Sequence, residues 1–219
     1  MDGANQLFRS NPRAFLQQNQ LVCYTQLSQQ KTDINRINGN TLNVTQQFQP
    51  VVEFDLQRHP MGYYNVALVG GTGSFATSSL TRRLGYGSPI VGNYIPYLGQ
   101  KDKKPKSKHF GRINLSQVQT NFVFTFTFTG CNFVVTQNRH DGDVYVYHEP
   151  TADSWTTSIQ DRYPDDVVVG TVGPRYDDNH VNGYGCLIRI GPTRWRACVQ
   201  TSAIGQVGVT ALDELEFSV

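Results

Sequence analysis

The sequence has little charge and no long hydrophobic run. Charged residues make up 16% of the 219 residues and the formal net charge is +2, so the overall charge gives no basis for binding nucleic acid or an acidic membrane. No apolar stretch approaches the roughly 20 residues of a membrane-spanning helix. The chain also begins without the basic-then-apolar order of a secretory signal. We therefore expect no nucleic-acid partner and no membrane partner.

Cysteine is scarce as well. The chain has four cysteines: Cys23, Cys131, Cys186 and Cys198. That number is too small for a disulfide scaffold, and neither CxxC spacing nor the five histidines complete a zinc pattern. We expect no metal and no cofactor. A turn at residues 191–192 would set Cys186 opposite Cys198 on neighbouring strands, within bonding range. The sequence leaves open whether these two are bonded.

Two motifs suggest function only at first sight. The segment 66–84 resembles a dinucleotide-binding fingerprint, but no acidic residue follows between Asp55 and Asp102 to bind a ribose. It is interpreted as a glycine-rich turn. The acidic pairs Asp165-Asp166 and Asp177-Asp178 do not sit in a calcium-binding loop, and they are expected to be surface-loop residues.

The chain changes character near residue 50. Residues 1–50 form a Gln- and Asn-rich segment, expected to be partly helical, with residues 15–27 as the only plausible helix. Residues 51–219 are predicted to form a single β-rich domain of two packed sheets, because short β-branched and aromatic runs alternate with Gly, Pro, Asn and Asp. The expected strands cover residues 51–56, 63–69, 121–130, 131–137, 143–149, 166–173, 185–191, 193–201 and 206–212.

The segment 121–155 carries the most informative pattern. Strict alternation from Phe122 to Phe128 predicts a strand with its four phenylalanines on one buried face and its threonines on the other. Gly130 then breaks the pattern immediately before Cys131. Two further strands follow around the sequence QNRHDG, which is typical of a hairpin loop.

The hairpin register decides whether Cys131 meets His148. A loop centred on residues 139–140 would place the two directly opposite each other, with Cβ atoms about 4.5–5.5 Å apart. A tight Asp141-Gly142 turn would instead pair His148 with Val135. A Cys facing a His suits nucleophilic catalysis, because an imidazolium holds the thiol as thiolate. The alternative is a buried Cys and an edge His without a chemical role.

The motifs TFTFTGC and VYHEPTADSW resemble the centre of Burkholderia lethal factor and, more distantly, the cytotoxic necrotizing factors. The spacing of Thr125, Cys131 and His148 is also similar to that of bacterial chemoreceptor glutamine deamidases. The resemblance covers residues 121–155. It implies an α+β fold, a β-sandwich of mixed sheets with peripheral helices and long loops. It also implies that the chain converts a glutamine side chain of a target protein to glutamate.

The resemblance assigns three catalytic roles. Cys131 is the nucleophile, His148 the base, and Thr125 orients the imidazole. On a continuous strand Thr125 would lie roughly 20 Å from Cys131, so the chain must bend sharply, and residues 129–130 are the expected place. Gly130 would also free backbone N–H groups to stabilise an oxyanion.

From this reading we expect a monomer that acts on a host target protein carrying the substrate glutamine. It would reach the host cytosol by secretion or injection without a classical signal peptide, or be cytoplasmic in the producing cell. Two other readings stay open. One is a non-catalytic β-sandwich interaction or coat module. The other is a cysteine protease or transglutaminase that uses the same dyad.

Overall fold

The computed structural model describes residues 3–23, 51–71, 88–95, 112–128, 131–149, 159, 163–174, 180–203 and 206–219, and the structural statements below concern these residues. The helices are α1 (Gly3–Ser10), α2 (Pro12–Gln18) and the 3-10 helix η2 (Leu115–Gln117). The strands are β1 (Leu21–Val22), β2 (Val51–Arg58), β3 (Tyr64–Gly71), β4 (Ile90–Tyr94), β5 (Arg112–Asn114), β6 (Phe122–Phe128), β7 (Asn132–Asn138), β8 (Val144–Glu149), β9 (Asp166–Val172), β10 (His180–Arg189), β11 (Arg194–Ala203) and β12 (Ala211–Ser218).

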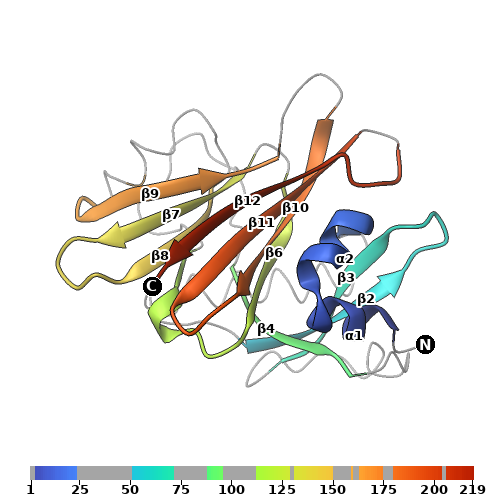
Figure 1. Ribbon diagram of the computed structural model, residues 1–219, viewed down its shortest axis with the longest axis horizontal. Helices are drawn as coiled ribbons and strands as arrows, with labels where there is room; N and C mark the ends of the chain where they lie inside the picture. Colours follow the sequence, from blue (N-terminus) through green and yellow to red (C-terminus); the bar gives the residue numbers. More distant parts are fainter. Residues whose placement is uncertain are drawn as a thin grey trace.

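The strands form two sheets (Figure 1). Sheet A has eight strands in the order β1-β3-β2-β4-β6-β10-β11-β12, and it is mixed because β1 runs parallel to β3 and β4 parallel to β6. Sheet B has four antiparallel strands in the order β5-β8-β7-β9. The predicted α+β sandwich with peripheral helices is confirmed.

The central strands of sheet A are buried on both faces. Along β10, Cys186 and Ile188 belong to the cluster that includes Phe8 of α1, whereas Leu187 belongs to the cluster shared with sheet B. This alternation follows from the two-residue period of a strand. One face of sheet A therefore packs against the N-terminal helices, which lie over β2 and β3 in Figure 1, and the other packs against sheet B.

The N-terminal helices differ from the single helix predicted over residues 15–27. Proline at the first position of α2 and Asn11 as its N-cap begin that helix earlier, and it ends before Asn19. Leu21 and Val22 then pair with β3 as a strand. Helix α1 was not predicted from the sequence, although its Phe8 is completely buried. None of the described helices is long and apolar enough to cross a membrane.

The strand predictions hold for β2, β3 and the strands from β6 to β11, whereas β4, β5 and β12 differ from them. The run 206–212 was expected to be a strand, but residues 206–210 are not extended and β12 covers Ala211–Ser218 instead. The acidic residues of β12 obscured its pattern in the sequence. They are paired with arginines, for example Glu216 with Arg194 at 2.7 Å. The short strands β4 and β5 were also missed.

Strand β6 contains a β-bulge. Tyr184 and Cys186 of β10 are two residues apart, but their partners Thr127 and Phe124 on β6 are three apart. One extra residue on β6 therefore lies at positions 125–126, and side chains beyond it exchange faces.

The bulge corrects the predicted single aromatic face. Phe122 and Phe124 pack on the helix side of sheet A, whereas Phe128 packs with Val123 on the side of sheet B. The side chain of Phe126 lies outside the described residues. Thr127, expected on the same face as Thr125, instead bonds the backbone of Cys23 at 3.1 Å.

Candidate functional site

The hairpin between β7 and β8 has neither of the two predicted registers. His148 lies directly opposite Phe133 rather than Cys131 or Val135. The loop is longer than an Asp-Gly turn because Asn138 organises it. Its carbonyl accepts from the N–H of Gly142 at 3.0 Å, and its side-chain oxygen accepts from the N–H of His140 at 2.9 Å. Gly142 takes a φ of 76°, which favours glycine.

This register still leaves Cys131 near His148. Cys131 precedes Phe133 by two residues, and it shares a buried cluster with Phe133 and Phe128. Cys131 directly precedes β7, and its place in this cluster puts it on the same inner side of sheet B as Phe133, the direct partner of His148. The predicted direct pairing is wrong, but both side chains belong to the interior between the two sheets.

Thr125 reaches His148 across that interior. Its Oγ1 lies 2.5 Å from Nδ1 of His148 and 2.9 Å from the carbonyl oxygen of Ile95. The contact is possible because β6 belongs to sheet A and β8 to sheet B, so the chain changes sheet between Phe128 and Asn132. The bend predicted within this interval, at residues 129–130, lies outside the described residues.

The two contacts of Thr125 define the state of the imidazole. A carbonyl oxygen can only accept, so the hydroxyl proton of Thr125 goes to Ile95. The hydroxyl oxygen must then accept from Nδ1–H of His148. The proton of the neutral ring is thus on Nδ1, and Nε2 carries the lone pair that a general base requires.

Phe128 holds the other side of the ring. Its ring centroid lies 4.5 Å from that of His148 with the planes tilted by 48°. Phe128 also makes an edge contact with Phe133 at 4.9 Å. Gly185 permits this arrangement, since a Cβ there would lie 2.1 Å from Phe128. The sequence did not predict this role for Phe128, because the bulge that turns its side chain toward sheet B leaves no clear signal.

Burial sets the electrostatics of the site. His148 is 2% exposed, and desolvation lowers its pKa from 6.5 to about 3. The ring is therefore neutral at pH 7, and the predicted imidazolium that would hold a thiolate is not the resting state. Cys131 is 1% exposed. Both side chains are therefore enclosed, and the base available near the thiol is a neutral imidazole.

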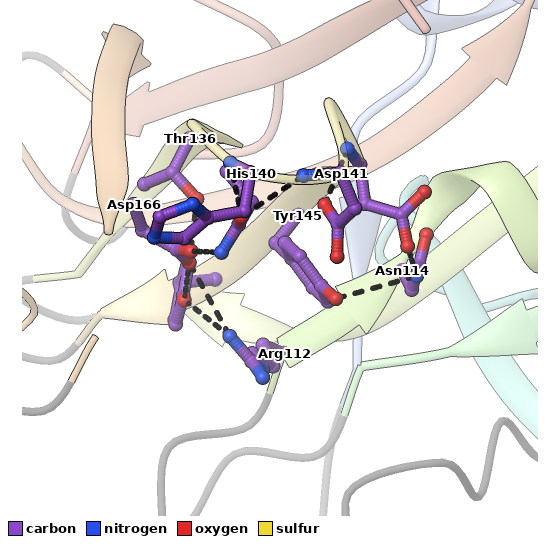
Figure 2. A network of polar contacts seen from close by, with 10 residues as sticks. Arg112, Asn114, Thr136, His140, Asp141, Tyr145 and Asp166 are labelled. Atoms are coloured by element: carbon purple, nitrogen blue, oxygen red, sulfur yellow. Dashed lines mark hydrogen bonds and ion pairs between the residues drawn. The ribbon is translucent and has the colours of Figure 1, made fainter. Parts of the chain in front are cut away.

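A second polar cluster lies on the outer face of sheet B (Figure 2). Asp166 was expected at the surface but is 2% exposed, so that prediction is wrong. Its carboxylate accepts from Tyr147 at 2.7 Å and from Asn138 at 2.9 Å. It also accepts from Arg112 at 3.3 Å and Thr136 at 3.2 Å. Four donors saturate this carboxylate, which favours a structural role over acid–base chemistry.

Arg112 completes this second cluster. Its guanidinium stacks on the rings of Tyr145, at 4.1 Å, and Tyr163, at 3.7 Å. Desolvation raises the pKa of Tyr147, which keeps this phenol as a neutral donor to Asp166. Because Tyr147 precedes His148 on β8, the cluster fixes the outer side of the strand whose inner side carries the imidazole.

The described residues were compared with what a metal site requires. No three His, Cys, Asp or Glu residues there are grouped to hold a metal ion. Of the glycine-rich segment 66–84, residues 66–71 belong to β3, and the remainder lies outside the described residues, as do Asp177 and Asp178.

Comparison with known proteins adds little. No protein-family model and no curated protein sequence matches the chain. Among solved structures, the chain has a distant similarity to the C-terminal domain of CNFy from Yersinia pseudotuberculosis, with a TM-score of 0.32 and 11% identity over 85% of this chain and 97% of that one. A similarity this low supports no conclusion about activity. The family resemblance of residues 121–155 thus stays a prediction.

Proposed function

We propose that this chain is a cysteine-dependent protein-glutamine deamidase of the toxin or effector type. The contact that supports the proposal best is the hydrogen bond from Nδ1 of His148 to Oγ1 of Thr125, at 2.5 Å. These residues are 23 positions apart in the sequence and lie on different sheets. A buried hydroxyl that fixes the tautomer of a histidine beside a cysteine is what thiol chemistry requires.

The reaction follows from the positions of the protons. Nε2 of His148 accepts the thiol proton as Sγ of Cys131 attacks the carboxamide carbon of the substrate glutamine. The same nitrogen returns the proton to the departing ammonia, which leaves a thioester at Cys131. Water, deprotonated by His148, then hydrolyses the thioester to glutamate and the free thiol. The target loses two N–H donors and gains a negative charge.

The substrate in this proposal is a host protein that presents the glutamine, and the enzyme acts as a monomer delivered into the host cytosol. The low exposure of Cys131 and His148 means that catalysis includes an opening step. Opening also hydrates the imidazole, and this weakens the desolvation that holds its pKa low.

One observation favours a different function. A non-catalytic interaction module predicts a buried Cys131, and Cys131 is 1% exposed. Such a module would use Thr125, Ile95 and His148 only to join the two sheets. A buried hydrogen-bonded pair of this kind stabilises a core without any chemistry.

Alkylation of the native chain decides between these functions. Cys23, Cys186 and Cys198 serve as internal controls, because they are 8%, 0% and 1% exposed. The chain is treated with iodoacetamide near neutral pH, and labelling is mapped by mass spectrometry. A deamidase labels at Cys131 without denaturant while the three controls stay unmodified. If all four cysteines require denaturant, the thiol enzyme is excluded and the interaction module stands.

A further inference from the structure

Cys186 and Cys198 face each other on neighbouring strands. The register pairs them directly across β10 and β11, as the turn at residues 191–192 predicted. Directly opposed residues of antiparallel strands have Cα atoms about 4.5–5.5 Å apart, inside the range that disulfides span. Both side chains belong to the cluster on the helix side of sheet A, so the two thiols point the same way.

The pair is free and enclosed. Both residues are buried and neither is bonded. The thiol of Cys198 donates to Glu214 at 3.7 Å, and Arg13 contacts the same carboxylate at 3.0 Å. Loss of the thiol proton would therefore leave Glu214 paired with Arg13. Oxidation of the pair would therefore not leave the Glu214 carboxylate as an unpaired charge.

We infer that Cys186 and Cys198 form a disulfide site, which is filled when the chain folds in oxidising surroundings and closed to oxidants once the chain has folded. The oxidant is a low-molecular-weight disulfide such as oxidised glutathione. One thiolate attacks it to give a mixed disulfide and one reduced glutathione. The second thiolate then displaces the other glutathione, so that one S–S bond forms in the protein as one is reduced.

The folded chain protects the pair from oxidants because both thiols are buried. The thiolate is the attacking species in exchange. In the folded chain, desolvation raises the pKa of Cys186 well above its usual value and that of Cys198 to about 12. Neither thiol is then reachable or ionised. Whether the pair is bonded or reduced therefore depends on the compartment in which the chain folded. It does not depend on Cys131, which lies on the other face of sheet A.

Production of the full chain in two bacterial hosts tests the inference, one host with a reducing and one with an oxidising cytoplasm. Free thiols are trapped with N-ethylmaleimide in denaturant before trypsin digestion. Cleavage at arginines places Cys186 in peptide 176–189 and Cys198 in peptide 197–219. The expected result is one linked species of these two peptides, from the oxidising host alone.

Matched variants and a second arm complete the test. Cys198→Ala should abolish the linked species, and Cys23→Ala should retain it. The folded, reduced chain should form the bond at least about 100-fold more slowly with oxidised glutathione than the same chain in denaturant. Fully alkylated peptides from the oxidising host, or links shared with Cys23, would overturn the disulfide site. Equal oxidation rates would overturn its closure.

Discussion

Replacing Thr125 by valine separates the chemistry of the site from its packing. Valine keeps the shape and removes the hydroxyl, so Nδ1 of His148 and the carbonyl of Ile95 both lose a buried partner. A buried group left unsatisfied costs about 1–3 kcal/mol, so the two together should lower the free energy of unfolding by roughly 2–6 kcal/mol. Turnover should fall about ten- to a hundredfold, because the ring loses its fixed tautomer.

The assay that isolates the tautomer is nitrogen NMR on chain labelled in histidine, with the signal of His148 identified from a His148→Gln variant. The wild type should show a protonated Nδ1 and a bare Nε2. Thr125→Val should shift the ring toward the other tautomer, and Thr125→Ser should restore it. Thr127→Val removes a hydroxyl with two partners on Cys23 and no contact with His148, so it serves as the stability control. An unprotonated Nδ1 in the wild type, or the same tautomer in the wild type and all variants, would show that Thr125 does not fix the tautomer of His148.

Three further changes follow from burial and packing. Since the pKa of His148 falls from 6.5 to about 3, the unfolded chain binds this proton first. Stability should be fully present above about pH 6.5 and decline toward pH 3 by about 1.4 kcal/mol per unit, and His148→Gln should remove that slope from unfolding curves. Gly185→Ala forces a Cβ against the Phe128 ring and should cost about 1–3 kcal/mol in denaturant unfolding, whereas Gly3→Ala meets no atom within 4 Å and should not destabilise. Asp166→Ala should lower the free energy of unfolding by about 3–5 kcal/mol, and the exposed Asp165→Ala by less than about 0.5 kcal/mol. Equal effects would show that the buried cluster around Asp166 does not stabilise the fold.

The sequence predicts those parts of the fold whose signal is local. Alternation of apolar and polar residues and the punctuation by Gly, Pro and Asp identified β2, β3 and the strands from β6 to β11. The opposed positions of Cys186 and Cys198 also followed from the turn between them. The short strands β4 and β5 and the acidic strand β12 were missed because their local sequences carry no strand pattern. They depend on pairing with other elements, β4 with β2 and β6, β5 with β8, and the acidic residues of β12 with arginines of β11.

The candidate site depends on features that no local pattern shows. The bulge in β6 is visible only against the register of β10, and it turns Phe128 toward sheet B, the side on which Thr125 contacts His148. The hairpin register depends on the side chain of Asn138, which competes with a two-residue Asp-Gly turn. The resemblance anticipated the contact of Thr125 with His148, whereas strand geometry alone argued against it.

The most direct test of the proposed function is the fate of glutamine in host proteins. Host-cell lysate is incubated with the wild-type chain and, in parallel, with Cys131→Ser, and peptides are mapped for the mass change of an amide converted to an acid. We predict that the wild type converts at least one glutamine to glutamate. Cys131→Ser should leave that glutamine intact, because a hydroxyl is a far weaker nucleophile beside a neutral imidazole. Equal conversion of glutamine by both chains would contradict the proposed function. So would the absence of any conversion by a wild type whose Cys131 is alkylated in the native state.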